Sequence, residues 1–392
     1  MRAFVFTDKS LASEAGRFVW LEIDTEKSRN APFRKQFPIE ALPTFLIVDP
    51  AEQNVALRWV GGATASQLRR LLDDGRLAVA GGGPEPAGRA GASSGDRPPE
   101  ADRLLLRADA LYGQGDNAGA AKAYQEALAA APEGWGRYGR TVESLLFALQ
   151  RTQASEEAAK LAREAYPRLR STPSAANVAA SGLDAALELP AESAARQELV
   201  AALEADAREV VADTTAPMAA DDRSGAFGSL LDAREDAKDD QGAKQVASEW
   251  AAFLEREAAR ARTPEERAVF DPHRLSAYLK LGEPKRAIPM LEASERDLPG
   301  DYNPPARLAV ALKAMKRWDD ALAASDRALS KAYGPRRLGI LQTRADIYSG
   351  RGDAGSARRT LEEALSAAEA MPEGQRSEST IASIKKKLQA SP

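Results

Sequence analysis

The feature that most constrains this chain is a pattern of small residues that recurs at intervals of about 34 residues. Ala287, Ala321 and Ala357 stand 34 and 36 residues apart, each in a run whose apolar residues have helical spacing. A helix–turn–helix repeat needs small residues where its two helices touch and larger ones between neighbouring repeats. The pattern therefore predicts an array of stacked helical hairpins.

Four segments fit this template in register, and each turns between its two helices at glycine or polar positions. They cover residues 101–134, 268–301, 302–335 and 338–371. These segments resemble tetratricopeptide repeats (TPR). The resemblance implies a TPR-type α-solenoid over residues 104–372, which would bind a client protein or peptide in its groove.

The middle of the array is helical but drifts from the template. Residues 139–267 favour one degenerate repeat within 144–166 and two longer helix pairs over 174–213 and 219–262. Residues 373–392 are predicted to form a capping helix and tail, with Ile381, Ile384 and Leu388 on its apolar face, because an open solenoid end needs a solvated cap.

Composition excludes several kinds of chemistry. The chain has no cysteine and a single histidine, His273, so it offers no thiol nucleophile, disulfide, cysteine zinc site or multi-histidine metal cluster. We predict no cofactor and no metal. A net charge of −4 with 29% charged residues gives no reason to expect a nucleic-acid partner.

The sequence also indicates where the chain resides. It contains no run of 18 apolar residues, which argues against a membrane span, and its first residues are too short an apolar stretch for a secretory signal. We expect the chain as given to be cytoplasmic, with the periplasm left open if a signal peptide lies upstream.

A segment poor in large apolar residues divides the chain. Residues 79–103 are rich in Gly, Pro, Ala and Ser, which predicts a flexible linker. Residues 1–78, by contrast, have a mixed α/β pattern. We predict buried strands at Phe18–Ile23 and Thr44–Val48, and an antiparallel edge strand at Asn54–Val60. Helices are predicted over Ser28–Phe37 and from Thr64 through Asp74, the latter ended by Gly75.

The order of these elements, with Leu42-Pro43-Thr44-Phe45 opening a strand and Trp59-Val60-Gly61 ahead of the last helix, resembles the second part of a thioredoxin-fold domain. The resemblance implies that Pro43 follows a cis peptide bond. It also implies that Leu42, Pro43 and Thr44 contact the substrate chain. Residues 1–78 would then be a partial thioredoxin-like domain, which gives an overall fold class of α/β plus all-α.

The chain differs from the thioredoxin family at the segment that carries the family's redox chemistry. A thioredoxin domain carries Cys-x-x-Cys at the start of a helix, whose dipole lowers the pKa of the first thiol. This chain begins at Met1, in what resembles the remainder of that helix, and the strand before it is missing. We therefore expect a truncated N-terminus, with true loss of redox chemistry as the alternative.

Two glycine patterns resemble nucleotide-binding motifs, and some TPR proteins carry a clamp for a carboxylate. Residues 134–139 and 350–355 satisfy G-x-G-x-x-G, but both lie between predicted helices, so we interpret them as turns. The clamp positions hold no basic residue: Leu105, Asp109, Pro272, Ser276, Ala306, Val310, Gln342 and Asp346. Arg307, Lys313 and Arg344 either face the groove or are solvated.

Two functions remain after these exclusions. The first is a bacterial thiol–disulfide oxidoreductase in its full-length form, with the solenoid recruiting client proteins and an upstream Cys-x-x-Cys performing the exchange. The chain as given would be redox-incompetent. The alternative is a non-catalytic thioredoxin–TPR holdase or scaffold for protein–protein interaction.

Overall fold

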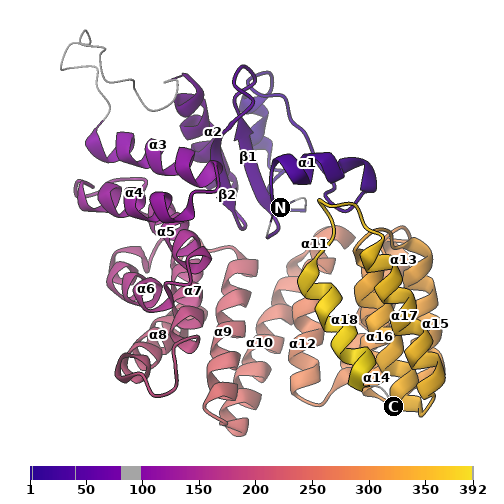
Figure 1. Cartoon of the computed structure of the whole chain (residues 1–392). Coiled ribbons are helices and arrows are strands. Elements are labelled where there is room, and N and C mark those ends of the chain that lie inside the picture. Colours follow the sequence, from indigo (N-terminus) through magenta and orange to yellow (C-terminus); the bar gives the residue numbers. More distant parts are fainter. Residues whose placement is uncertain (2, 40, 81–98, 391–392) are drawn as a thin grey trace. The chain divides into compact units, whose positions relative to one another are not determined.

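The computed structural model describes residues 1, 3–39, 41–80 and 99–390, and helices dominate it (Figure 1). The chain forms two compact units: Met1–Arg17 with Ala41–Val246, and Phe18–Glu40 with Ala247–Pro392. Neither unit ends at the predicted linker. The helices on either side of it reach Ala80 and begin at Glu100, and residues 81–98 lie outside the described part.

The first unit contains a two-stranded antiparallel sheet. Strand β1 (Thr44–Val48) pairs with β2 (Val55–Val60), with Thr44 opposite Val60. Helix α2 (Ala65–Ala80) contacts both strands and buries Leu68, Leu71 and Leu72, and the 3₁₀ helix η1 (Lys9–Glu14) contacts α2. The strands predicted at 44–48 and 54–60 and the helix after Thr64 are confirmed.

Gly75 does not end α2, contrary to the prediction. It lies inside the helix, where a Cβ would come within 2.1 Å of Ile47 Cδ1. The glycine therefore serves the close packing of α2 on β1 and is not a helix terminator.

The prediction of a strand at Phe18–Ile23 is wrong. These residues form no strand, and Val19 and Leu21 are 88% and 76% exposed. A strand needs a neighbour that satisfies its backbone N–H and C=O groups, and the described residues form only the β1–β2 sheet. The fold therefore does not support a thioredoxin-like domain in residues 1–78.

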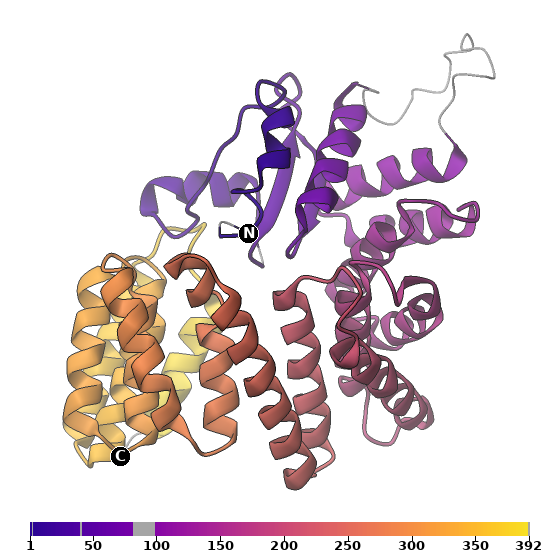
Figure 2. The ribbon, with the colours of Figure 1, turned by 180° about the vertical axis from the view of Figure 1, so that it is seen from behind.

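Helical hairpins make up the rest of the first unit. Helices α5, α7 and α9 contact one another in succession and form one layer, and α6 and α8 contact each other in a second layer (Figure 2). The helices are α3 (Glu100–Gly113), α4 (Asn117–Ala129), α5 (Tyr138–Arg151), α6 (Ser155–Leu169), α7 (Ala175–Leu187), α8 (Ala194–Ala212), α9 (Ala220–Asp236) and α10 (Asp240–Arg260), which continues into the second unit. The helix pairs predicted between 139 and 267 are present.

The second unit continues the array. Ala287, Ala321 and Ala357 are 0%, 0% and 1% exposed, as the repeat template predicts. Its helices are α11 (Pro264–Ala268), α12 (Asp271–Lys280), α13 (Ala287–Asp297), preceded by η3 (Pro284–Arg286), α14 (Asn303–Ala314), α15 (Trp318–Lys331), α16 (Arg336–Arg351), α17 (Ala354–Glu369) and α18 (Glu378–Ala390). Helix α18 contacts α17 and buries Ile381 and Ile384, two of the residues predicted on its apolar face.

None of the helices in the described part of the chain is long and apolar enough to cross a membrane.

An N-terminal segment docks on the last hairpins of the second unit, which the sequence did not predict. It includes η2 (Ser28–Asn30) and α1 (Ala31–Gln36). The buried Gln375 side chain donates through Nε2 to the Thr25 carbonyl at 3.0 Å. Further along, Lys35 Nζ lies 2.7 Å from Glu373 Oε2. The bonds Tyr333–Asp24 and Arg336–Glu26 extend the same contact.

This contact is testable through Gln375. The substitution Gln375→Ala leaves the Thr25 carbonyl without its donor, and losing one buried hydrogen bond costs about 1–3 kcal/mol. We expect trypsin to cleave the variant at Arg29 at least about five times faster than the parent, because local opening becomes more frequent. The exposed Gln389→Ala is the matched control, and equal cleavage rates in all three proteins would contradict the account.

A second test concerns the close approach of α6 and α7. A Cβ at Gly182 would lie 2.3 Å from Ala162 Cβ, so Gly182→Ala must push the helices apart and should destabilise the protein by about 1–3 kcal/mol. Gly225 in α9 has open space around it, and Gly225→Ala should stabilise by about 0.5–1 kcal/mol. Urea unfolding measures both, and a stabilising Gly182→Ala would refute the packing.

Candidate protein-binding face

The thioredoxin resemblance implies that Leu42, Pro43 and Thr44 contact a substrate. These three residues lie at the start of β1. The Leu42–Pro43 peptide bond is cis, as expected, and Leu42 is 67% exposed. The Pro43 carbonyl accepts from Gly61 N–H at 2.9 Å, and the Thr44 hydroxyl donates to the Ala41 carbonyl at 2.6 Å. No cysteine exists in the chain to act beside them. Their contact with a substrate stays a prediction.

The basic residues considered for a peptide clamp are engaged within the array. Lys313 Nζ lies 3.4 Å from Asp346 Oδ2, and Arg344 Nη1 lies 2.5 Å from Asp326 Oδ1. Burial lowers the pKa of Arg307, which Asp271 and Asp301 partly offset. The side chains of Lys313 and Arg344 therefore connect neighbouring helices.

A buried ionic network fixes α5 against the helices before it. Asp109, fully buried on α3, accepts from Arg140 Nη2 at 2.5 Å and from the Tyr124 hydroxyl at 2.9 Å. Arg137 Nη2 lies 2.6 Å from Asp74 Oδ1, which connects α5 to α2. Burial raises the pKa of the Asp109 carboxyl, and the Arg140 guanidinium offsets part of the effect. Removing one partner of such a pair leaves a buried charge uncompensated.

The layer of α5, α7 and α9 carries a polar surface, which we call the acidic face. Its members recur three, four or seven residues apart on each helix, a spacing that places them on one side. They are Glu143, Phe147 and Gln150 on α5, Asn177, Ser181, Asp184 and Glu188 on α7, and Asp222, Ser229 and Asp232 on α9. Three adjacent helices thus bring carboxylates, amides and hydroxyls to one side, where Glu143 and Ser229 are buried and Asp184, Glu188 and Asp232 are exposed.

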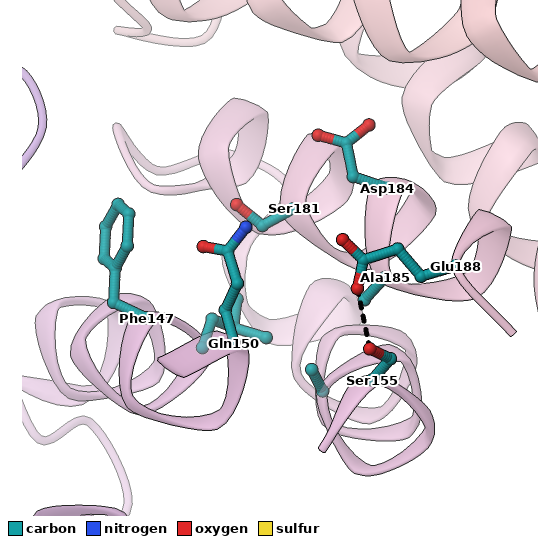
Figure 3. Close-up of a pocket in the computed structure, with 9 residues that line it drawn as sticks. Phe147, Gln150, Ser155, Ser181, Asp184, Ala185 and Glu188 are labelled. Carbon is teal, nitrogen blue, oxygen red and sulfur yellow. Dashed lines mark hydrogen bonds between the residues drawn. The ribbon is translucent and has the colours of Figure 1, made fainter. Parts of the chain in front are cut away.

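A pocket of about 40 Å³ opens on this face between α5, α6 and α7 (Figure 3). Phe147 and Gln150 reach it from α5, and Asp184 and Glu188 from α7, with Ser181 between them. The Ser155 hydroxyl of α6 donates to Glu188 Oε2 at 2.7 Å. The pocket is therefore mixed in character, with carboxylate, amide and hydroxyl groups beside the apolar side chains of Leu146, Phe147, Ala158 and Ala185.

Glu143 is the most buried carboxyl of the acidic face, at 2% exposure. Asn177 Nδ2 donates to its Oε2 at 3.0 Å. Burial raises the pKa of Glu143 to about 8, and Asp222 adds repulsion, while bonds from Ser174 and Asn177 oppose the shift.

The neighbouring carboxyls are perturbed in the same direction. The Asp184 side chain is partly exposed to solvent. Desolvation by the helices packed around it, together with repulsion from Asp232 and Glu188, nevertheless raises its pKa to about 6. Burial, with repulsion from Asp221, raises the pKa of Asp222 to about 7, and the Met1 ammonium only partly opposes this. Within the described residues, no lysine or arginine side chain forms an ion pair with any of the five carboxyls of the face.

This face was not predicted from the sequence. The peptide-clamp positions in the four segments that fit the repeat template concern basic residues, and the face lies on other helices. The available signal was polar residues at helical spacing on the first helices of the drifting repeats, such as Asn177, Asp184 and Glu188.

The raised pKa of Glu143 predicts how stability depends on pH. The unfolded chain ionises this carboxyl near its ordinary value of 4.5, while the folded chain holds the proton up to about pH 8. The folded state therefore loses stability as pH rises from about 4.5 to 8, an effect that a glutamine removes. We expect Glu143→Gln to gain more than about 2 kcal/mol at pH 8 and almost nothing at pH 4.

Urea unfolding at both pH values measures this difference. Glutamine can still accept from Asn177, so the hydrogen bond at Oε2 is kept. The exposed Glu164→Gln is the matched control and should leave stability unchanged at either pH. A Glu143→Gln variant less stable than the parent at pH 8 would contradict a protonated, unpaired Glu143.

No protein-family model matches the chain, and no curated protein matches it. Several solved structures are similar to it at low identity. A tetratricopeptide repeat protein from Parabacteroides merdae is 13% identical over 74% of this chain and 98% of its own, with a TM-score of 0.44. The TPR2AB domain of yeast Sti1 in complex with pHSP90 is 14% identical over 74% and 98%, with a TM-score of 0.29.

The Cut9–Hcn1 hetero-tetramer of the APC/C is 14% identical to this chain over 82% of it and 54% of that chain, with a TM-score of 0.33. The chain's own architecture is clear from its elements: successive antiparallel helix pairs, buried alanines at the predicted positions, and turns at Gly115, Gly282 and Gly352 with positive φ. The chain is a helical-repeat protein built from successive antiparallel helix pairs.

Proposed function

We propose that the chain is a non-catalytic scaffold that binds a segment of a partner protein on its acidic face. The observation that carries this proposal is the concentration of carboxyls without a lysine or arginine partner among the described residues, beside a small pocket, on one layer of three adjacent helices. Exposed carboxylates can accept hydrogen bonds from a bound segment, and charge-assisted hydrogen bonds are among the stronger ones. This chemistry supports binding at this place.

The oxidoreductase predicted from the thioredoxin resemblance has less support. Thiol–disulfide exchange requires a thiolate, and none of the 392 residues is a cysteine. The two-stranded sheet offers no thioredoxin core, and Leu42, Pro43 and Thr44 have no nucleophile to serve. Of the two functions left open by the sequence, the scaffold or holdase is therefore the one proposed for this chain.

Selection from a random peptide library tests the proposal without assuming a partner. Peptides are selected against the whole chain, and their affinities are then measured for two variants. Ser181→Trp places a bulky side chain in the centre of the acidic face, where Ser181 lines the pocket. Lys160→Trp places the same side chain at an exposed position of α6 that does not line the pocket and pairs with Glu156.

We expect most selected peptides to lose at least about tenfold in affinity for Ser181→Trp, because a ring at the pocket excludes the segment. Lys160→Trp should bind them as the parent does. Peptides that bind both variants equally well would show that the acidic face is not the binding surface. Circular dichroism of the two variants confirms that each retains its helices.

A further inference from the structure

We infer that the contact between the turn after β2 and helices α5 and α9 is a pH-sensitive switch. The contact is closed while the Asp222 carboxyl keeps its proton, and it opens when that proton is lost. The turn consists of Gly61, Gly62 and Ala63, between the end of β2 and the start of α2. The inference goes beyond the proposed function, because it concerns a contact within the chain and does not require a partner.

The turn lies directly on the two helices. A Cβ at Gly61 would lie 3.7 Å from Phe147 Cζ of α5, and a Cβ at Gly62 would lie 3.5 Å from Asp222 Oδ1 of α9, both ordinary packing distances. Ala63, the next residue of the turn, is 6% exposed. Glycine backbone therefore rests against an aromatic ring and a carboxyl.

The Asp222 carboxyl has no partner that would hold it as a carboxylate. It is half-buried, and it forms neither an ion pair nor a hydrogen bond with other residues in the described part of the chain. The turn adds no titratable side chain. An ionised carboxyl packed in this way loses water without gaining a hydrogen-bond donor, whereas a protonated carboxyl is neutral and loses less. The closed contact therefore favours the protonated form.

The charges that face Asp222 act in both directions. Asp221, its neighbour on α9, repels it, and the buried Glu143 carboxyl of α5 faces it across the layer. The Met1 ammonium attracts it. Burial is the largest effect, and with the repulsion from Asp221 it exceeds the attraction and raises the pKa of Asp222 to about 7.

Other charged groups on the helices packed against α9 act away from the turn. Arg223 lowers the pKa of Asp213, at the end of α8. On α7, the Asp184 carboxyl is repelled by Asp232, which lies near the other end of α9. Asp222 is thus the titratable side chain that the turn covers.

The sign of the switch follows from proton linkage. Opening returns the Asp222 carboxyl to water, where its ordinary pKa is 3.8. Between about pH 4 and pH 7 the closed contact keeps a proton that the open form has lost, so rising pH favours opening. Above about pH 7 both forms are ionised and the balance no longer changes. The switch therefore acts just below neutral pH.

The turn can open without breaking a strong bond to the helices. Its Gly61 N–H donates to the Pro43 carbonyl at 2.9 Å, within the sheet. The Ala63 N–H lies 3.4 Å from Met1 Sδ, and a thioether is a weak acceptor. Neither bond involves α5 or α9. The Ala63 amide therefore depends on the closed turn for its protection from water.

Hydrogen exchange of the Ala63 amide, resolved to single residues by mass spectrometry, tests the inference on the whole chain. Rates are measured from pH 5 to pH 8 and divided by the intrinsic rate at each pH, which leaves the opening equilibrium. We expect the parent to lose protection at Ala63 at least about tenfold from pH 5 to pH 8, because ionised Asp222 favours the open turn.

Two variants of α9 locate the effect. Asp222→Asn has no proton to lose, so its protection at Ala63 should change no more than about twofold over the same range. Asp232→Asn removes an exposed carboxyl of the same helix and should keep the pH dependence of the parent. Circular dichroism checks that both variants retain their helices, and the profile of the parent tests the switch without any substitution.

Three results would overturn the inference. The first is a parent whose protection at Ala63 is the same at pH 5 and pH 8. The second is an Asp222→Asn variant that loses protection with pH as the parent does. The third is an equal loss at the amides of α17 in the second unit, which would show a general loss of stability in place of a local opening.

Discussion

Close contact between paired helices at very small residues is the constraint on which the rest of the structure depends. Gly182 allows α7 to approach Ala162 of α6, and Ala287, Ala321 and Ala357 occupy buried positions in the second unit. Interiors pack as densely as organic crystals, so one extra methyl group at such a contact is felt. Contacts of this kind hold successive helices together and set α5, α7 and α9 side by side, which creates the acidic face.

The small sheet is part of the first unit because it packs directly on the helices. A Cβ at Gly113 of α3 would lie 2.5 Å from the Val55 carbonyl of β2, so the sheet and the first hairpin meet without a gap. The ion pairs of Arg137 and Arg140 with Asp74 and Asp109 add fixed polar contacts among α2, α3 and α5. Buried pairs of this kind contribute more to a defined orientation than to net stability. They hold α5, and with it Glu143 and Phe147, in place.

Much of the fold could be predicted because the repeat pattern is local. Helical spacing and small residues identified the hairpins, and alternation identified β1 and β2, since each signal lies within a few residues. The strand expected at Phe18–Ile23 failed because an apolar run does not reveal whether a partner strand exists. The docking of Thr25 on Gln375 joins residues 350 positions apart, and no local pattern encodes it. The acidic face was missed for the same reason, because it arises only when three separate helices align.

Cross-linking mapped by mass spectrometry tests the central claim most directly. A peptide selected from the library, carrying a benzophenone at its centre, is photolysed with the whole chain, and the attachment sites are identified. The account predicts attachment to residues of α5, α7 and α9 around Ser181, which Ser181→Trp abolishes. Attachment concentrated on α6 and α8, or on the helices of the second unit, would contradict it.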